Sequence, residues 1–287
     1  MFGKRPDGRL IKNLEPMQQI MPYIMKTRTD SMNMYEDVID CAAMDAYIKE
    51  KLDETGVRLD YMQIIIAAMV RLIALRPQLN RFVMNGRIYA REKIWVSFVV
   101  HHRLRDGDTG TTIKLCFDGT ETIFQVAEKI REAVLKETAN HSGENDTDKL
   151  MRTLMKRIPS FLIKFVVDTL LWMDKHCILP RRIIELSPFH TSLFITNLKS
   201  LGINHIYHHV YNFGTTGLFF AMGKEAEAVT AWRGEISTHK QMGYGLVMDE
   251  RFCDGLYFAL SLRRLGKIMK NLHELEQPLE KKNEDFE

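Results

Sequence analysis

The fold of this chain is decided by the segment Met248-Asp249-Glu250-Arg251-Phe252-Cys253-Asp254-Gly255. It follows the apolar run Gly245 to Met248, which is short and bounded by turn residues, as buried strands are. It precedes Leu256 to Leu272, a run with the apolar spacing of a helix. The segment therefore joins a buried strand to a helix, and it places carboxylate side chains at that junction.

Length and charge limit the classes of protein to consider. A chain of 287 residues, 45% of them hydrophobic, is long enough to bury a sizeable core. We expect one domain over residues 1–275, followed by a charged and frayed tail over residues 276–287. Forty basic residues against thirty-seven acidic ones give a formal charge of +3. This balance lacks the dense basic stripe that binds nucleic acid, so we expect no nucleic-acid partner.

The cysteines and the apolar stretches indicate a cytoplasmic protein with no membrane segment. The four cysteines form no C-x-x-C pair and suggest reduced thiols rather than a zinc ribbon or a disulfide framework. The N-terminus is polar and lacks the apolar core of a secretory signal. The most apolar stretch, Phe161 to Met173, is too short to cross a bilayer and contains Lys164 and Asp168.

Helical and strand patterns alternate along the chain without the spacing of repeated βαβ units. This order favours an α/β fold in which helices cover an open mixed sheet. Expected helices are residues 14–32, Ala42–Glu54, Tyr61–Ala74, Thr122–Ala139 and Leu150–Met173, the last one broken near Pro159. Expected strands are Met32–Ile39, Phe82–Tyr89 with a turn at Asn85-Gly86, Trp95–Arg103, Thr111–Phe117, Leu193–Thr196, Gly217–Met222 and Gly245–Met248, with loops at Arg105–Gly110 and Asn140–Asp148.

Ordered motifs over about residues 10 to 272 resemble one acyltransferase superfamily. Tyr61 to Asn80, followed by Asn85-Gly86, resembles the long helix, P-x-L-N turn and hairpin of chloramphenicol acetyltransferases and of the catalytic domains of 2-oxo-acid dehydrogenase complexes. Leu193 to Leu198 resembles the T-I-S/T-N segment of the dehydrogenase acyltransferases, and Phe220 to Lys224 resembles the strand after it. Asp249 to Gly255 is similar to their D-H-R-x-x-D-G segment.

The resemblance implies a two-layer α/β sandwich that forms a homotrimer, with the active site in a channel between subunits. It implies acyl transfer between coenzyme A and a thiol or hydroxyl acceptor, with CoA or acyl-CoA as the substrate and small molecules as donor and acceptor. The chain starts at the catalytic domain, so we expect no lipoyl or peripheral-subunit-binding domain and a free-standing protein.

In this superfamily a histidine takes the proton of the acceptor, and a serine or threonine hydroxyl binds the oxyanion. The resemblance assigns the oxyanion donor to Thr196, with Ser192 as the alternative and Asn197 as a further channel residue. It makes Asp254 a structural carboxylate that needs a cationic partner, which we expect to be one of two residues near the N-terminus. It makes Gly255 the position at which the chain turns closely beneath the site. The two candidate partners of the carboxylate are Lys26 and Arg28.

Glu250 stands where the motif has its histidine. A solvated glutamate titrates near ~4.3 and a thiol near ~8.5, so this carboxylate is about four units too weak as a base. Burial that raises the glutamate pKa toward ~6–7 would restore it. Alternatively, Glu250 pairs with Arg251 or with a basic group of a neighbouring subunit. Two functions therefore stay open: an acyltransferase with an atypical base, and a non-catalytic trimeric binding or scaffold protein.

Other reactive side chains offer further alternatives. His205, His208 and His209 have the spacing of metal ligands on one helix face, but the resemblance places them in a loop near the channel. We predict no metal site, because no carboxylate or thiolate accompanies them; one of them is instead a candidate replacement base. His190 and the pair His101-His102 are weaker candidates for that role. The choice stays open for Cys253, between a nucleophile and a buried inert thiol. For Leu150–Met173 we predict core packing, with an acyl pocket or a partner-binding face as the alternatives.

Overall fold

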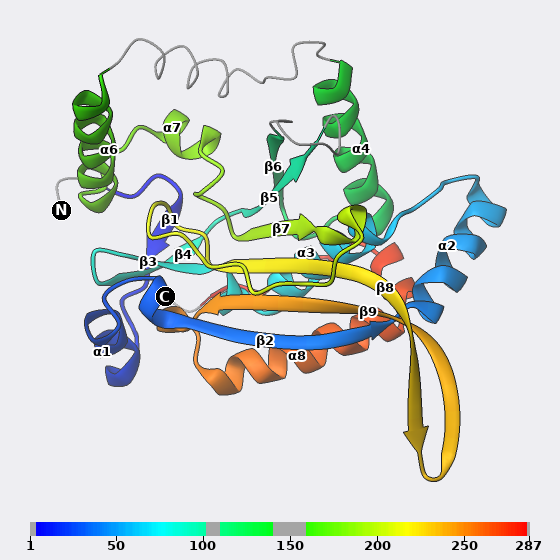
Figure 1. Cartoon of the computed structure of the whole chain (residues 1–287). Helices are drawn as coiled ribbons and strands as arrows, with labels where there is room; N and C mark the ends of the chain where they lie inside the picture. The colour runs from blue at the N-terminus through cyan, green and yellow to red at the C-terminus, as the bar shows by residue number, and fades with distance from the viewer. Residues whose placement is uncertain (1–3, 102–109, 140–158, 286–287) are drawn as a thin grey trace.

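The computed structural model describes residues 4–101, 110–139 and 159–285, and it shows an α/β fold built on a six-stranded mixed sheet (Figure 1). The sheet has the strand order β2-β9-β8-β7-β5-β6, and a second, three-stranded sheet has the order β1-β4-β3. The strands are β1 (Gly8–Leu10), β2 (Met32–Asp40), β3 (Arg81–Met84), β4 (Arg87–Arg91), β5 (Ile94–Val100), β6 (Thr111–Phe117), β7 (Leu193–Asn197), β8 (Leu218–Trp232) and β9 (Glu235–Asp249).

The helices lie mainly along one face of the large sheet and at its ends (Figure 1). The α-helices are α1 (Pro16–Ile24), α2 (Cys41–Thr55), α3 (Tyr61–Leu75), α4 (Ile123–Ala139), α6 (Ser160–Lys175), α7 (Arg181–Leu186) and α8 (Gly255–Lys270). Short 3-10 helices are η1 (Thr29–Ser31), η2 (Pro77–Asn80), η3 (Leu198–Leu201), η4 (Glu250–Phe252) and η5 (Leu272–Glu276). The expected open mixed sheet is confirmed, because β7 runs parallel to β5 and β8 while the other pairs are antiparallel.

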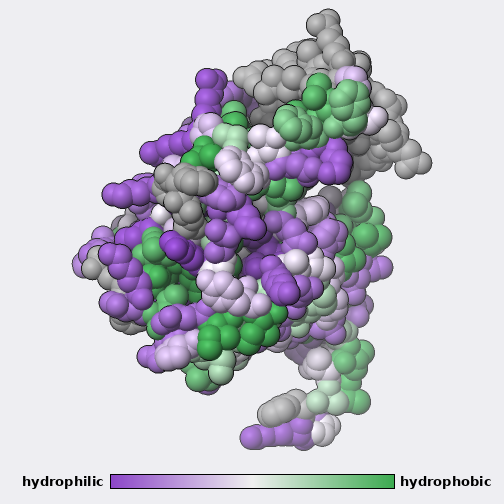
Figure 2. Space-filling view, turned by 90° about the vertical axis from the view of Figure 1, so that its left-hand side faces the viewer, coloured by the Kyte–Doolittle hydropathy of each residue, from purple (hydrophilic) through white to green (hydrophobic). Residues whose placement is uncertain are grey.

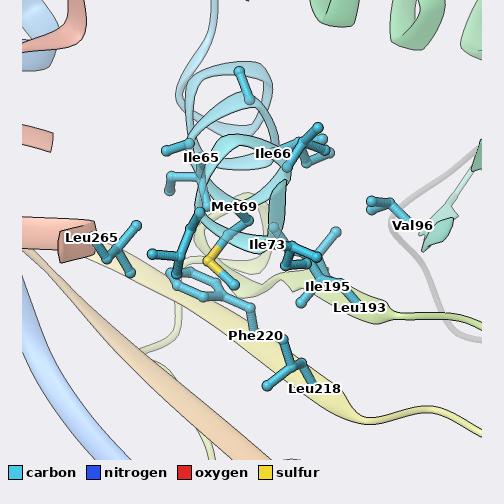
Figure 3. Close-up of a cluster of buried hydrophobic side chains, with 14 of the residues drawn as sticks. Ile65, Ile66, Met69, Ile73, Val96, Leu193, Ile195, Leu218, Phe220 and Leu265 are labelled. Atoms are coloured by element: carbon cyan, nitrogen blue, oxygen red, sulfur yellow. The ribbon is translucent and has the colours of Figure 1, made fainter. Parts of the chain in front are cut away.

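Helix α3 forms the centre of the core. Asp60 caps its N-terminus through a capping box with Gln63. Nearly all its side chains are buried, because it lies between the sheet and the helices α4 and α8. Its sheet-facing side chains, Met69 among them, contact Phe220 of β8 and neighbouring aliphatic side chains (Figure 3). The long apolar run in the sequence therefore forms a buried helix, as predicted.

The predicted hairpin turn at Asn85-Gly86 is also confirmed. It joins β3 to β4, and both turn residues have positive φ, 51° for Asn85 and 72° for Gly86. This backbone suits asparagine and glycine and matches the twist of the paired strands. The ring of Tyr23 lies on Gly86, where an added Cβ would come within 2.7 Å of it.

Several elements differ from the predicted ones. Strands β8 and β9 each have fifteen residues, whereas the sequence predicted two short strands. The extra residues form a hairpin that extends away from the rest of the molecule (Figure 1), where no apolar run is needed to fill a core. Helix α1 ends at Ile24, well before residue 32.

The charged segment after η5 packs against the domain instead of fraying. Asp285 accepts hydrogen bonds from Arg81 at 2.6 and 2.7 Å, and this pair is almost fully buried. The backbone N–H groups of Leu279 and Asn283 donate to Thr120 and Ala74. The expectation of a free tail is therefore wrong up to Asp285, because this carboxylate has a buried cationic partner that sequence spacing does not reveal.

Some predicted features lie outside the described residues. These are His102, most of the loop Arg105–Gly110, the loop Asn140–Asp148 and residues 150–158 of the apolar stretch. The remainder of that stretch forms α6, whose exposed side chains include Phe161 (75%) and Phe165 (65%). The prediction that this part of the stretch packs in the core is therefore wrong. Within the described ranges, no helix is long and apolar enough to cross a membrane.

The central position of α3 gives a stability prediction. Met69 is 0% exposed, so Met69→Ala should lower the free energy of unfolding by about 2–5 kcal/mol through lost burial and a cavity. Met17 on α1 is 67% exposed, and Met17→Ala, the same chemical change, should alter it by less than about 0.5 kcal/mol. Urea unfolding measures both values; equal effects would contradict the central role of α3.

Candidate functional site

Asp249 is the centre of the turn that carries the motif. It is 0% exposed at the end of β9, and its carboxylate accepts hydrogen bonds from Ser31 Oγ (2.9 Å) and from Arg251 Nε (2.8 Å) and Nη2 (2.6 Å). Its side chain also accepts the backbone N–H of Arg251, which starts η4. The carboxylate therefore determines the path of the chain at Glu250.

Arg28 supplies a second cation to this carboxylate. Its Nε lies 3.8 Å from Asp249, while its Nη atoms donate to the carbonyl oxygens of Asn212 (2.9 Å) and Val83 (3.0 Å). Complete burial lowers the pKa of Arg28 to about 10. The expectation that Lys26 or Arg28 pairs with Asp254 is therefore wrong, because the buried carboxylate that needs a cation is Asp249.

Asp254 and Gly255 have simpler roles than the resemblance implies. Asp254 is exposed and caps α8 by accepting the backbone N–H of Tyr257 at 2.7 Å. Gly255 is the first residue of α8, and an added Cβ would meet nothing within 4 Å. The glycine is therefore not required by a close approach of the chain within this subunit.

Glu250 is half-buried on η4 and does not form the expected pair with Arg251. The guanidinium of Arg251 is held by both oxygens of Asp249 instead. Within the described part of the chain, the Glu250 carboxylate has no hydrogen-bond or ion-pair partner. It therefore lies at a fixed turn, and its oxygens are unpaired among the described residues.

Thr196 lies on the sheet face opposite α3. It shares that face with Phe194, two residues earlier on β7, whose ring stacks on Phe219 at 5.0 Å. Thr196 pairs with Ala221 on β8, which pairs with Gly245 on β9. No hydrogen bond to its hydroxyl occurs within the described residues.

Thr196 and Glu250 do not meet within one chain. Gly245, level with Thr196 in the sheet, lies five residues before Glu250. A strand rises about 3.3 Å per residue, so the two candidate groups are separated by roughly 16 Å along the sheet. A site that contains both must take them from two subunits.

Ser192 and Asn197 have structural roles within the chain. Ser192 is 2% exposed, and its hydroxyl accepts the backbone N–H of Trp95 at 3.0 Å. Asn197 caps η3 by accepting the N–H of Ser200 at 3.4 Å. Both side chains are therefore held by partners within the chain.

The segment that holds His205, His208 and His209 is not helical and lies across the outer face of the sheet. It rests on glycines: a Cβ on Gly243 would lie 2.6 Å from the His205 ring, and one on Gly245 would lie 2.5 Å from the Ile206 carbonyl oxygen. Because the segment is extended, the three imidazoles do not share a helix face, so the metal-ligand spacing has no structural basis.

The three histidines have separate environments. His205 Nε2 lies 3.2 Å from a carboxylate oxygen of Glu36 on β2. His208 stacks on Phe219 with ring centroids 3.9 Å apart, and burial lowers its pKa. His209 is exposed. Phe219 lies two residues before Ala221, the strand partner of Thr196, which is about 7 Å along β8. His208, which stacks on Phe219, therefore lies on the same sheet face as Thr196 and near it.

Two further candidates are held in place. His190 is 1% exposed, with Nε2 3.0 Å from Asp174 and Nδ1 2.8 Å from Ser187 Oγ, so both ring nitrogens are occupied. Cys253 is 1% exposed, and burial raises the pKa of its thiol, which fits the inert alternative rather than the nucleophile. His101 is exposed just after β5.

A different group of potential metal ligands comprises Glu50, His273 and Glu276, whose ligand atoms lie within 4.8 Å of one another. The Lys51 ammonium lies 2.7 Å from Glu50 and 3.1 Å from Glu276. A protein cation therefore already balances these carboxylates. Sequence reasoning did not find this group because Glu50 is more than two hundred residues from His273 and Glu276.

The fold is shared with known acyltransferases. A probable dihydrolipoamide acetyltransferase from Listeria monocytogenes 4b F2365 superposes with a TM-score of 0.58 at 14% identity, covering 91% of this chain and 95% of that one. The Azotobacter vinelandii dihydrolipoamide acetyltransferase gives 0.55 at 14% identity, covering 92% and 93%. A chloramphenicol acetyltransferase gives 0.53 at 10% identity, covering 92% and 100%.

No family model and no curated protein sequence matches this chain. At these identities the structural likeness establishes the fold alone. The chain has the chloramphenicol acetyltransferase-like α/β fold that its sequence motifs predicted.

The buried turn gives a second prediction. Asp249→Asn keeps the shape of the side chain but leaves the guanidiniums of Arg28 and Arg251 buried without a counter-charge, so the free energy of unfolding should fall by about 3–5 kcal/mol. Asp254→Asn is the matched control, because asparagine caps a helix as well as aspartate and the site is exposed. Chemical denaturation compares the two variants; equal stability would disprove the central role of Asp249.

Proposed function

We propose that this protein is a CoA-dependent acyltransferase that acts as a homotrimer, with each site assembled from two subunits. In this proposal Glu250 of one subunit takes the proton of a thiol or hydroxyl acceptor, and Thr196 of the next donates a hydrogen bond to the oxyanion. The acyl group passes from the CoA sulfur to the acceptor, and the proton passes to the CoA thiolate.

The observation that carries the proposal is the separation of the two groups within one chain. The Glu250 carboxylate and the Thr196 hydroxyl each have no partner among the described residues, although both occupy ordered positions on η4 and β7. Polar groups that are held in place but left unpaired are suited to a partner from another copy. The shared fold supports this reading, because the structures it resembles include the cubic core of the pyruvate dehydrogenase multienzyme complex.

The chemistry of the base limits the activity. A glutamate with an ordinary pKa is about four units below a thiol, so proton transfer from the acceptor is unfavourable until the subunit interface excludes water. Packing of a second subunit over the half-buried η4 would supply that exclusion. His208, on the sheet face of Thr196, is the alternative base. An imidazole ordinarily titrates near ~6.5, closer to a thiol than a glutamate does, and burial lowers the pKa of His208 from that value.

The mismatch of base strength also favours a second candidate function, a non-catalytic trimeric binding protein. In this alternative the fold is kept, and the Glu250 carboxylate pairs with a basic group of the neighbouring subunit. The two candidates predict different responses to substitution of the same residue.

Calorimetric titration of CoA and acetyl-CoA, beside a thioester turnover assay, tests the proposal. Dihydrolipoamide serves as the thiol acceptor and chloramphenicol as the hydroxyl acceptor, since proteins of this fold act on them by name. Glu250→Gln should lower kcat by about 10²–10⁴ through loss of the base, and Glu250→His should raise it at least about tenfold. Absence of CoA binding at millimolar concentration would exclude the enzyme.

Mixing two inactive variants tests the shared site. Glu250→Gln and Thr196→Val each remove one half of it, so a mixed trimer contains some sites with both native residues. Activity should return to about a quarter of the native value, because each site takes its two residues independently. If mixing restores no activity, the two residues either act within the site of one subunit or do not act in the reaction at all. Turnover only in Glu250→His would favour the non-catalytic protein.

A further inference from the structure

A cavity of about 670 Å³ opens between α1, the β3–β4 hairpin and the C-terminal turn of α6. These elements lie on the left-hand side of Figure 1, and Figure 2 views that side directly, where hydrophobic and hydrophilic side chains form separate patches. The volume lies within the range of small-molecule sites in proteins.

Positive charge predominates at the floor of the cavity. Arg28 and Arg251 line it, and behind them Arg5 and Arg91 belong to the same buried cluster. Among the described residues, these four guanidiniums pair with three carboxylates: Arg5 with Asp174 (2.6 Å) and Asp7 (2.7 Å), Arg91 with Asp7 (3.5 Å), and Arg251 (2.6 Å) and Arg28 (3.8 Å) with Asp249.

The remaining groups of the cluster do not remove this excess. The pKa of His190 is lowered, chiefly by burial, so this ring stays neutral near pH 7. Arg28 has its Nε without a hydrogen bond, and burial holds its pKa at about 10. A buried positive charge that lacks a full counter-charge costs stability, and an anion bound beside it removes that cost.

Two lysines add positive charge at the mouth. Lys26, after α1, and Lys175, at the end of α6, are both exposed and line the opening. Within the described ranges, neither ammonium has a carboxylate partner. Asp174 is the one carboxylate among the described lining residues, and it is already bound to Arg5 and His190. The nearby Asp30 is exposed and accepts the backbone N–H of Thr27.

The walls are apolar and aromatic. Tyr23 covers the hairpin turn from one side, and Trp172 flanks the opening from the other. Between them lie Met84, Leu171 and Pro22. A ligand that fits therefore has a flat or aliphatic body that packs against the walls, and one anionic group that pairs with the guanidiniums at the floor.

We propose that this cavity binds a small organic anion, with a carboxylate, sulfonate or phosphate group on an aromatic or acyl body. The anionic group lies beside Arg28 and Arg251, with Lys26 and Lys175 attracting it to the opening. The site is separate from the Glu250–Thr196 arrangement and does not depend on acyl transfer. It shares one residue with the turn that carries Glu250, because Arg251 lines the cavity and follows Glu250 in η4.

Calorimetric titration of the full chain with 2-naphthoate and with its neutral analogue 2-naphthamide tests the proposal. The carboxylate should bind at least about tenfold more tightly than the amide. The double substitution Lys26→Glu with Lys175→Glu should weaken 2-naphthoate at least about tenfold, since it reverses the charge at the mouth. Equal binding of acid and amide, or no binding of the acid at millimolar concentration, would overturn it.

Two control proteins make the result specific to this cavity. Lys49→Glu with Lys224→Glu makes the same charge change at exposed lysines on α2 and β8, and binding should stay within about twofold of the native value. Met84→Trp leaves every charge in place but fills the cavity, so it should abolish binding while circular dichroism shows a folded protein. Equal weakening by both lysine pairs, or full binding by a folded Met84→Trp protein, would contradict the assignment.

Discussion

The carboxylate of Asp249 connects two parts of the chain that are distant in the sequence. Through Arg28 and Ser31 it connects the N-terminal segment to the end of β9, and through Arg251 it determines the course of the turn that precedes α8. A buried carboxylate with two guanidiniums is costly to disturb, because any single loss leaves an unpaired charge in the interior. The orientation of Glu250 and the floor of the adjacent cavity therefore both depend on the side chain of Asp249, which has no catalytic role in the proposed reaction.

The sheet imposes the second constraint. Its register places the Thr196 hydroxyl and the Glu250 carboxylate at different levels of the same sheet, so no rearrangement of side chains within one subunit brings them together. The glycines on the outer face, Gly243 and Gly245, admit the histidine segment close to the strands near Thr196. In the proposed acyltransferase, catalysis therefore depends on the oligomeric state, and the choice between an enzyme and a binding protein depends on which group of a second subunit lies beside Glu250.

Much of the fold was predictable because its signals are local. The buried helix α3 follows from a long apolar run with a capping residue, and the β3–β4 turn follows from Asn85-Gly86. The long β8–β9 hairpin was missed, because strands outside the core carry no apolar run. The apolar pattern of α6 predicted core packing, yet its side chains are largely exposed, since a hydrophobic run does not specify what covers it.

The sequence by itself determined the order of the main elements and the strand-to-helix junction that carries Glu250. Only the tertiary structure decided the ionic partners: Asp249, not Asp254, takes Arg28, and Arg251 leaves Glu250 unpaired within the subunit. The reason is physical. Secondary structure arises from residues within a few positions of one another, whereas a buried charge takes its partner from whichever segment the folded chain brings within about 4 Å.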